Sequence, residues 1–504
     1  MEVQATPAPC PLDSIKRYDR MFLGHPLGLF ILSMNEVWER FSFYGMKTIL
    51  ILYMVASKES GGLGLSYVEA GAIYGLYGCL TSVMILPGGW IADVLWGPRK
   101  ALLWGGVTIT FGHLAMALDS QWAFFAGLGL IILGTGLLKP SSTVMVSQLY
   151  PSNDPRQESG YTIYYMCINV GALIGALVVG YLGQRVSWHF GFGAAAIGMI
   201  LGLIVYILGY KVLGPVGRPT GLALDPVAFR QNGKRAIYGL AGAAMIVAAL
   251  VLVNTTGLLS FTFGGLVQVL GIVVIALPIV YFTSLFRRKD WSTTERNNLI
   301  VIVILFAFAT LFIAAADQRG SILTLFADEV THCTIGSYEF PSTWFVALNG
   351  ALVITLAPLF AWLWPKLGKR NPSIPAKFAW ALFFSSSAFA VMVVASLIAG
   401  PDRVRVGPEW LFMNVVLMTI GEMFLGPVGV AAFARLAPRK IASQMMAVWF
   451  MKGAIAGLLA GMAGGAYKKI PLALNFGIST AVLAAGGILL MVLGPWIRRL
   501  IASK

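Results

Sequence analysis

Apolar runs of about 18 residues or more recur along nearly the whole chain, and this pattern restricts the fold more than any other feature. Such a run is long enough for a helix to cross about 30 Å of hydrocarbon. The alternating pattern of about ten residues that marks a strand of a membrane barrel does not occur. Only 11% of the 504 residues are charged, whereas about 25% is usual in soluble globular proteins. The chain is therefore predicted to be an all-α polytopic membrane protein.

Polar stretches and Gly or Pro residues divide these runs into about fourteen predicted helices. Six helices form an N-terminal bundle over 26–213, and six form a C-terminal bundle over 299–504. A linker over 214–298 carries two inserted helices, and a polar tail over 1–25 lacks the features of a secretory signal. The predicted helices cover 27–55, 67–92, 101–118, 122–149, 161–183, 191–213, 236–253, 259–285, 299–326, 343–365, 378–399, 410–436, 442–467 and 471–496.

Lys and Arg gather in alternate loops, as they do in the cytoplasmic loops of membrane proteins. Placing the N-terminus inside puts about 25 of the 36 Lys and Arg residues on the cytoplasmic side and about 6 outside. We therefore expect both termini to be cytoplasmic. The net charge of +15 is spread over these loops and does not lie on one soluble face, so no nucleic-acid partner is expected.

The first predicted helix carries Glu36, Glu39 and Arg40 inside its apolar stretch. Each would cost roughly 2.5 to 3.5 kcal/mol at a helix centre, so only a bundle interior or a water-filled cavity can hold them. Together with Tyr44 and Lys47 they fall within an arc of roughly 140° of the helix. A buried ion-pair cluster that only fixes helix packing is the alternative, but burying ions is a poor source of stability. We therefore predict a functional ionic face.

Polar groups also interrupt later predicted helices. Lys139 lies within GTGLLKPSS in the fourth helix, where it is predicted to face inward and meet a carboxylate instead of extending to the membrane interface. Asp317 interrupts the seventh helix, Asn349 the eighth and Glu422 the tenth. Opposed charges thus come from both halves, as expected for alternating access around a central site.

Several segments resemble the proton-dependent oligopeptide transporters, a branch of the major facilitator superfamily. The stretch EVWERFSFYG over 36–45 is similar to the ExxERFxYYG signature of that family. Further segments resemble family motifs in the same order: GGWIAD at 88–93, GTGLLKP at 134–140, YYMCINVGALIG at 164–175, Asp317-Gln318, Asn349, IGEMFLGPVG at 420–429 and VWFMKG at 448–453. This resemblance covers almost the full chain. It implies the major facilitator fold with the extra helix pair that bacterial members usually carry.

The resemblance also implies uptake of dipeptides and tripeptides driven by an inward proton gradient. The coupling ion is H⁺, and neither a cofactor nor a metal is expected. Physical chemistry agrees, because a short peptide presents an ammonium and a carboxylate that walls of opposite charge can bind. The expected partners are small peptides and the lipid bilayer, with the chain acting as a monomer in a bacterial inner membrane.

Three kinds of side chain are implied to bind the peptide. Cations would bind its carboxylate, acidic and amide groups its ammonium, and aromatic rings would line the cavity. In that order, the residues are Arg40, Lys47 and Lys139; Glu422, Asn169 and Asn349; and Tyr44 and Trp449.

Proton coupling requires a group whose proton affinity changes with its surroundings, as that of a buried or paired carboxylate does. The resemblance implies this role for Glu36 and Glu39, which would exchange partners between Arg40 and Lys139. Glu422 would contribute by pairing with Lys139 on the inner side.

The resemblance implies a second ion pair, between Lys47 and Asp317, as a gate. This pair would close the outer side of the cavity in the inward-open state.

Some residues depart from the family pattern. Lys47 stands where most members have arginine, Met84 where tyrosine is frequent and Ile313 where tryptophan is usual. The pocket is therefore expected to be less aromatic and to offer fewer donors. Two alternatives are a major facilitator symporter for another zwitterion or anion, and a drug/proton antiporter. An intramembrane enzyme is least expected, because no arrangement of catalytic or metal-binding residues has suitable spacing.

Overall fold

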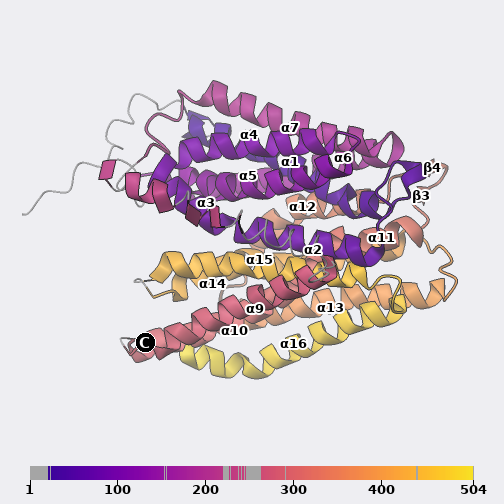
Figure 1. Cartoon of the computed structure of the whole chain (residues 1–504). Coiled ribbons are helices and arrows are strands. Elements are labelled where there is room, and N and C mark those ends of the chain that lie inside the picture. Colours follow the sequence, from indigo (N-terminus) through magenta and orange to yellow (C-terminus); the bar gives the residue numbers. More distant parts are fainter. Residues whose placement is uncertain are drawn as a thin grey trace, which may run out of the picture. The chain divides into compact units, whose positions relative to one another are not determined.

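The computed structural model describes residues 21–22, 24–151, 154, 156–219, scattered positions between 226 and 245, and residues 263–289, 291–438 and 441–502. These residues are mostly helical (Figure 1). Ten of the described helices are long and apolar enough to cross a membrane. Most of the inserted helix predicted at 236–253 and most of the tail over 1–25 lie outside the described residues.

The helices follow the predicted order. Their bounds are α1 Leu27–Val55, α2 Tyr67–Val83, α3 Ile85–Ile91, α4 Pro98–Met116, α5 Gln121–Gln148, α6 Arg156–Arg185, α7 Trp188–Gly209, α9 Phe263–Arg287, α10 Thr293–Asp317, α11 Ile322–Glu329, α12 Trp344–Lys366, α13 Ile374–Ala399, α14 Glu409–Leu436, α15 Ala442–Gly465 and α16 Leu472–Ala502. Shorter helical segments are η2 Lys58–Ser60, η3 Ala92–Trp96, η5 Gln318–Gly320 and η6 Gly368–Arg370. Two antiparallel hairpins join β1 Met21–Phe22 to β2 His25–Pro26 and β3 Thr334–Ile335 to β4 Tyr338–Glu339.

Two spans that the sequence predicts as single helices are broken. The span predicted over 67–92 divides into α2 and α3 at Met84. Pro87 explains this break, because it lacks an N–H and its ring clashes with the carbonyl four residues earlier. The span predicted over 299–326 divides into α10 and α11, with η5 between them. The second break places Asp317 at a helix end, where backbone groups and side chains are free to bind other partners.

The described contacts divide the chain into two compact units. Unit 1 comprises Met1–Phe43, Met84–Gly171 and Ala195–Leu252, and unit 2 comprises Tyr44–Val83, Ala172–Ala194 and Val253–Lys504. Unit 2 thus combines two segments of the first half of the sequence with the whole second half. The boundaries of the two bundles, 26–213 and 299–504, stay a prediction.

Glycines form a close seam between α2 and α15 inside unit 2. A Cβ atom added at Gly71 would lie 2.5 Å from the Gly461 carbonyl oxygen, and one at Gly457 would lie 2.9 Å from the Gly78 carbonyl carbon. Small residues of this kind let two helix backbones approach closely in a membrane. The seam therefore joins helices from the two halves of the sequence without side chains between them.

The inserted helix α9 packs beside this seam. Its Val274 forms a buried cluster with Ala72 and Cys79 of α2 and with Ala454 and Leu458 of α15. Other α9 side chains are exposed and apolar: Val269, Ile272, Val273, Ile275, Leu277, Ile279 and Val280. One face of α9 thus covers the seam, and the remaining surface suits lipid.

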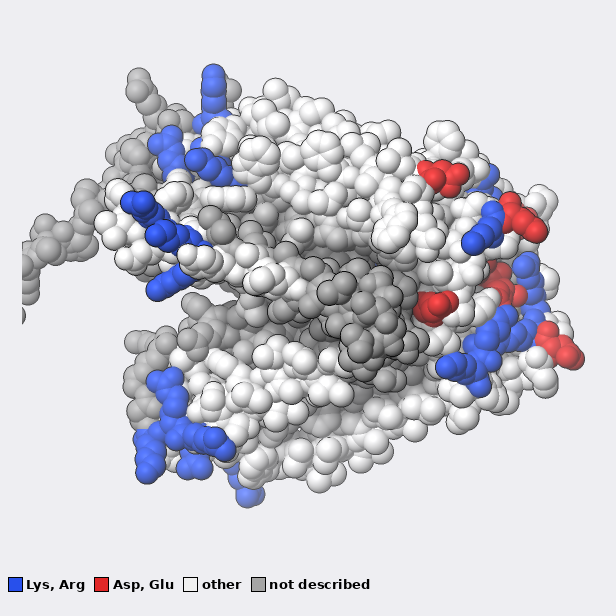
Figure 2. Space-filling model, in the orientation of Figure 1, with Lys and Arg blue, Asp and Glu red and all other residues white. Residues whose placement is uncertain are grey.

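Within unit 2, the two sets of helix ends differ in charge. On the face shown in Figure 2, the visible acidic side chains gather with Lys and Arg at the helix ends near α11 and the β3–β4 hairpin. Ion pairs at this end include Arg185 with Glu339 at 3.0 Å and Lys468 with Glu329 at 2.6 Å. At the opposite helix ends, the visible charged side chains are Lys and Arg.

Candidate functional site

The ionic side chains of α1 form one cluster inside unit 1, called here the carboxylate cluster. Arg40 Nε lies 3.3 Å from Glu36 Oε1, and Arg40 donates through Nε and Nη2 to both carboxylate oxygens of Glu39. Positions 36 and 40 are one helical turn apart, so their side chains meet on one face. All three residues are 1% exposed. The cluster therefore lies in a dry bundle interior, where two carboxylates share one guanidinium.

Lys139 supplies a second cation near the carboxylate cluster. Its Nζ lies 5.8 Å from the centroid of the Phe43 ring, and Arg40 Cζ lies 4.9 Å from the same centroid. Lys139 also interacts electrostatically with Glu39. The α5 lysine thus faces inward toward the charges of α1, which leaves the local set of two carboxylates and two cations neutral.

Two hydroxyl groups at Glu36 were missed by the sequence predictions. The Tyr164 hydroxyl of α6 donates to Glu36 Oε2 at 2.5 Å. Ser142 Oγ of α5 lies 2.7 Å from the Tyr164 hydroxyl oxygen and 3.5 Å from the same carboxylate oxygen. Both hydroxyl residues are buried. Tyr164 belongs to the YYMCINVGALIG segment, but its contact with a residue 128 positions away depends on how α1 and α6 pack.

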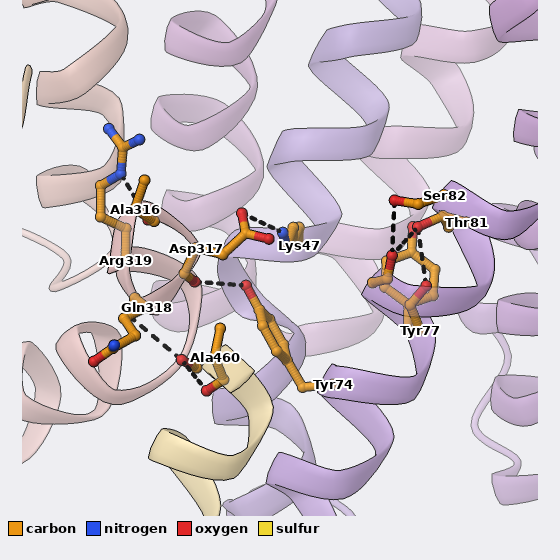
Figure 3. Close-up of polar contacts among 12 residues, drawn as sticks. Lys47, Tyr74, Tyr77, Thr81, Ser82, Ala316, Asp317, Gln318, Arg319 and Ala460 are labelled. Carbon is orange, nitrogen blue, oxygen red and sulfur yellow. Dashed lines mark hydrogen bonds and ion pairs between the residues drawn. The ribbon is translucent and has the colours of Figure 1, made fainter. Parts of the chain in front are cut away.

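A second polar region, called here the break region, surrounds the end of α10 in unit 2. Lys47 Nζ of α1 lies 3.3 Å from Asp317 Oδ1, and the two side chains point toward each other in Figure 3. The Tyr74 hydroxyl of α2 donates to the backbone carbonyl of Asp317 at 3.4 Å. The structure therefore brings the two predicted gate residues together.

Glu422 has a partner that the sequence predictions missed. Arg319 Nη2 lies 3.3 Å from Glu422 Oε2, and Asn349 Nδ2 donates to the same oxygen at 3.2 Å. Arg319 Nε also donates to the Ala316 carbonyl at 3.0 Å, at the end of α10. The pairing of Glu422 with Lys139 stays a prediction. Arg319 directly follows Asp317-Gln318, yet its pairing with α14 requires the helix break at η5.

The remaining predicted site residues lie on α1, α6 and α15. Asn169 donates its amide to the Tyr165 carbonyl of its own helix at 3.0 Å. Tyr44 is partly buried. Trp449 is 2% exposed, and its ring centroid lies 4.6 Å from that of Phe433 on α14. The roles predicted for these three side chains stay predictions.

No group of three or more His, Cys, Asp or Glu side chains in the described part of the chain could hold a metal ion. The charged residues described above pair with each other instead.

Comparison with known proteins identifies the family. The model of the POT family matches residues 99–482. A Bacillus subtilis (strain 168) protein named uncharacterized transporter YclF is 41% identical, over 95% of each chain. The Yersinia enterocolitica protein named peptide transporter YePEPT is 35% identical, over 95% of this chain and 96% of its own.

Solved structures agree with this assignment. A crystal structure of the peptide transporter POT in complex with sulfate is 38% identical and has a TM-score of 0.89, with 95% of this chain and 97% of that chain covered. Another, of a POT family transporter in complex with 5-aminolevulinic acid, is 32% identical and has a TM-score of 0.88, with 95% and 98% covered. The predicted major facilitator fold, with two six-helix bundles and two inserted helices, is confirmed. The chain is a multi-pass membrane protein and belongs to the proton-dependent oligopeptide transporter (POT) family.

Proposed function

We propose that this chain is a proton-coupled symporter that imports dipeptides and tripeptides by alternating access. The observation that carries the proposal is the carboxylate cluster, where Glu36 and Glu39 share Arg40 in a dry interior. Intramembrane ionisable residues of this kind mark ion pathways and proton relays. The names of the Yersinia relative and of the solved structures, which are peptide transporters, support a peptide as the substrate.

The two charged ends of the peptide bind to protein groups of opposite charge. The peptide carboxylate binds to Lys139, with Arg40 and Lys47 as further cations, and the peptide ammonium binds to Glu422. Asn349 already donates to Glu422 and holds this carboxylate in place. The ammonium therefore takes the position that Arg319 Nη2 occupies in the described structure.

The remaining residues complete the proposed site. Asn169 acts with Glu422 and Asn349 on the ammonium, and Tyr44 and Trp449 lie along the peptide. Aromatic rings suit this role because they provide contact area without requiring one particular substrate side chain.

Coupling follows from the charge of the carboxylate cluster. With Lys139 nearby, two carboxylates and two cations are balanced. When the peptide carboxylate attracts Lys139 away, Glu36 and Glu39 keep only Arg40 and one negative charge remains in a dry interior. Such a charge favours proton uptake by one carboxylate. Peptide binding and proton binding are thereby linked.

Contacts between the two halves of the sequence form the proposed outer gate. Within unit 2 they include Lys47 with Asp317, Tyr67 with Glu329, Gln184 with Asp328, and Arg185 with Glu339. These contacts must break for a peptide to enter from outside. The helix ends near β3–β4 are assigned to the exterior and the Lys- and Arg-rich ends to the cytoplasm of a bacterium, since basic residues favour the cytoplasmic side. Both chain termini are then cytoplasmic, in an inner membrane.

Uptake of labelled dialanine into proteoliposomes tests the proposal. An acidic exterior and an inside-negative potential should drive accumulation, and a protonophore should abolish it. The Glu36→Gln and Glu39→Gln variants should exchange dialanine across the membrane without accumulating it. A symporter for another zwitterion or anion would leave dialanine outside, and a drug/proton antiporter would expel a cationic drug under the same gradient. Either result would refute peptide import.

A further inference from the structure

Lys452 lies in the middle of α15 and has no role in the proposed mechanism. It is about 10 residues from Ala442 at one end and about 13 from Gly465 at the other. At 1.5 Å per residue these intervals are about 15 Å and about 20 Å. Both exceed the reach of a lysine side chain, so its ammonium group cannot extend to the membrane interface.

The ammonium group of Lys452 has contacts with its own helix. Nζ donates to the Trp449 carbonyl oxygen at 3.1 Å and lies 3.6 Å from the centroid of the Trp449 ring. No carboxylate of the described residues is within ion-pair distance of it. A cation–π contact is worth about 0.5 to 2 kcal/mol, whereas removing an ammonium from water costs several kcal/mol. One of its three N–H donors is used by the Trp449 carbonyl, so within the described residues two remain for another acceptor.

The charges inside the helical spans also show that a negative partner is missing. Among the described residues, the cations well inside the spans are Arg40, Lys47, Lys139, Arg319 and Lys452, and the carboxylates are Glu36, Glu39, Asp317 and Glu422. With Lys452 protonated, five cations against four carboxylates leave one positive charge. A zwitterionic peptide has no net charge and does not change this excess. A peptide with one acidic side chain has a net charge of −1 and balances it before the coupled proton is taken up.

The position of Lys452 relative to Glu422 suits such a peptide. The Trp449 ring packs against α14 at Gly429, which is seven residues, or about 10 Å, beyond Glu422 on the same helix face. Because α15 runs back along α14 after a short connection, Lys452 lies about 4.5 Å from Trp449 toward the level of Glu422. This leaves about 6 Å along the helix axis between the Cα atoms of Lys452 and Glu422, a length that about two extended residues span.

We infer that Lys452 binds the side-chain carboxylate of an acidic peptide, so that this transporter prefers dipeptides and tripeptides containing Asp or Glu. The inference rests on the proposed function and adds a substrate class to it. The peptide ammonium lies at Glu422, and the acidic side chain forms an ion pair with Lys452 beside the Trp449 ring. Glu422 and Lys452 both belong to the second half of the sequence. Binding of one peptide by these two residues therefore does not depend on the contacts of the proposed gate.

Competition against labelled dialanine uptake in proteoliposomes tests this inference. The competitors are Ala-Glu and Ala-Gln, which differ by one charge and have nearly the same shape. For the wild-type chain, Ala-Glu should compete at about a tenfold lower concentration, equivalent to about 1.4 kcal/mol. In Lys452→Gln the two peptides should compete equally, and Lys452→Arg should restore the preference. The matched control is Lys377→Gln, because Lys377 also contacts a ring, 4.0 Å from the Trp364 centroid, but lies near the start of α13. It should keep the wild-type preference.

Thermal stabilisation of the purified full chain by each peptide gives a second readout that does not need transport. Ala-Glu should raise the Tm of the wild-type chain more than Ala-Gln does, and Lys452→Gln should remove the difference. Equal competition by both peptides in the wild-type chain would overturn the inference, and so would a preference that survives in Lys452→Gln. If both peptides compete equally less well in Lys452→Gln, Lys452 would bind the peptide backbone and not the acidic side chain, which also overturns the inference. A wild-type chain that takes up no dialanine refutes the proposed function itself, a separate outcome.

Discussion

The carboxylate cluster and the break region contain the same kinds of ionic side chain in different surroundings. In the cluster, Glu36, Glu39 and Arg40 are 1% exposed, and Arg40 contacts both carboxylates. In the break region, the side chains of Lys47 and Asp317 are 13% and 30% exposed, and a single 3.3 Å contact joins them. The pair of Arg319 with Glu422 is similarly exposed and also has one contact.

This difference in exposure and bonding suits the two regions to different tasks. A dry cluster with several bonds cannot release a partner without leaving a buried charge uncompensated, so its charge changes most readily by taking up a proton. A partly wet pair with one contact loses little when it opens, because water replaces the lost partner. The cluster is therefore suited to coupling, and the break region is suited to gating and to partner exchange with a substrate.

The largest effect is expected from neutralising the cluster. Glu39→Gln removes the carboxylate that accepts two bonds from Arg40, and proton-driven accumulation of dialanine should fall by about 100-fold or more, since a broken buried pair costs about 3 to 5 kcal/mol. Counterflow exchange of dialanine across proteoliposomes, which needs no proton movement, checks that the protein still binds peptide. Glu59→Gln in the exposed turn η2 is the control. Intact accumulation in Glu39→Gln would place coupling elsewhere.

A smaller loss is expected when the proposed gate pair, Lys47 with Asp317, is broken. Lys47→Ala should lower dialanine uptake by about tenfold, because Asp317 loses its cation but remains partly hydrated. The exchanged pair Lys47→Asp with Asp317→Lys should recover part of the uptake, which a purely local packing defect would not allow. Initial uptake rates at one fixed pH gradient measure both. If the initial uptake rate of the double variant is no higher than that of Lys47→Ala, the ion pair does not form the gate.

Removing the Tyr164 hydroxyl should have a more moderate effect on the cluster. Tyr164→Phe leaves Glu36 with fewer donors, and a hydrogen bond to a charged group is worth about 1.5 to 3 kcal/mol. The pH profile of proton-driven uptake should therefore shift while counterflow exchange persists. Tyr181→Phe is the matched control, since Tyr181 is on the same helix and is 44% exposed. Identical pH profiles for the two variants would show that the hydroxyl does not act on Glu36.

The smallest effect is expected at the helix ends near β3–β4. Lys468→Ala removes an ion pair with Glu329 whose lysine side chain is 44% exposed. Exposed pairs contribute about 1 kcal/mol or less, so the Tm and the uptake rate should stay close to the wild-type values. Added salt should also leave the Tm and the uptake rate of the variant close to those of the wild-type chain. A loss as large as that of Lys47→Ala would mean that the pair of Lys468 with Glu329 also belongs to the gate.

The sequence predicts local features of the fold and site well. The bounds predicted for the first helix, 27–55, agree with α1, because the apolar length that crosses a membrane also determines where the helix ends. The pairing of Glu36 with Arg40 follows from helix periodicity alone. The family motifs also led to the correct family.

Contacts between distant helices could not be predicted in the same way. The bonds of Tyr164 with Glu36 and of Arg319 with Glu422 join residues 128 and 103 positions apart, so they depend on helix packing and on the break at η5. That break contains no proline. Gly320 allows Tyr74 to pack closely against this break, because a Cβ atom there would lie 2.1 Å from the Tyr74 hydroxyl, a contact that no local pattern reveals.

The packing of α9 on both α2 and α15 has a consequence for the surrounding bilayer. If the glycine seam separates during transport, Val274 must lose its neighbours on at least one of the two helices. In a membrane, acyl chains cover such newly exposed apolar surface as well as protein does. Lipid tails then occupy the open seam and stabilise the separated helices. The length and packing of the acyl chains in the bilayer therefore affect the turnover rate of this transporter.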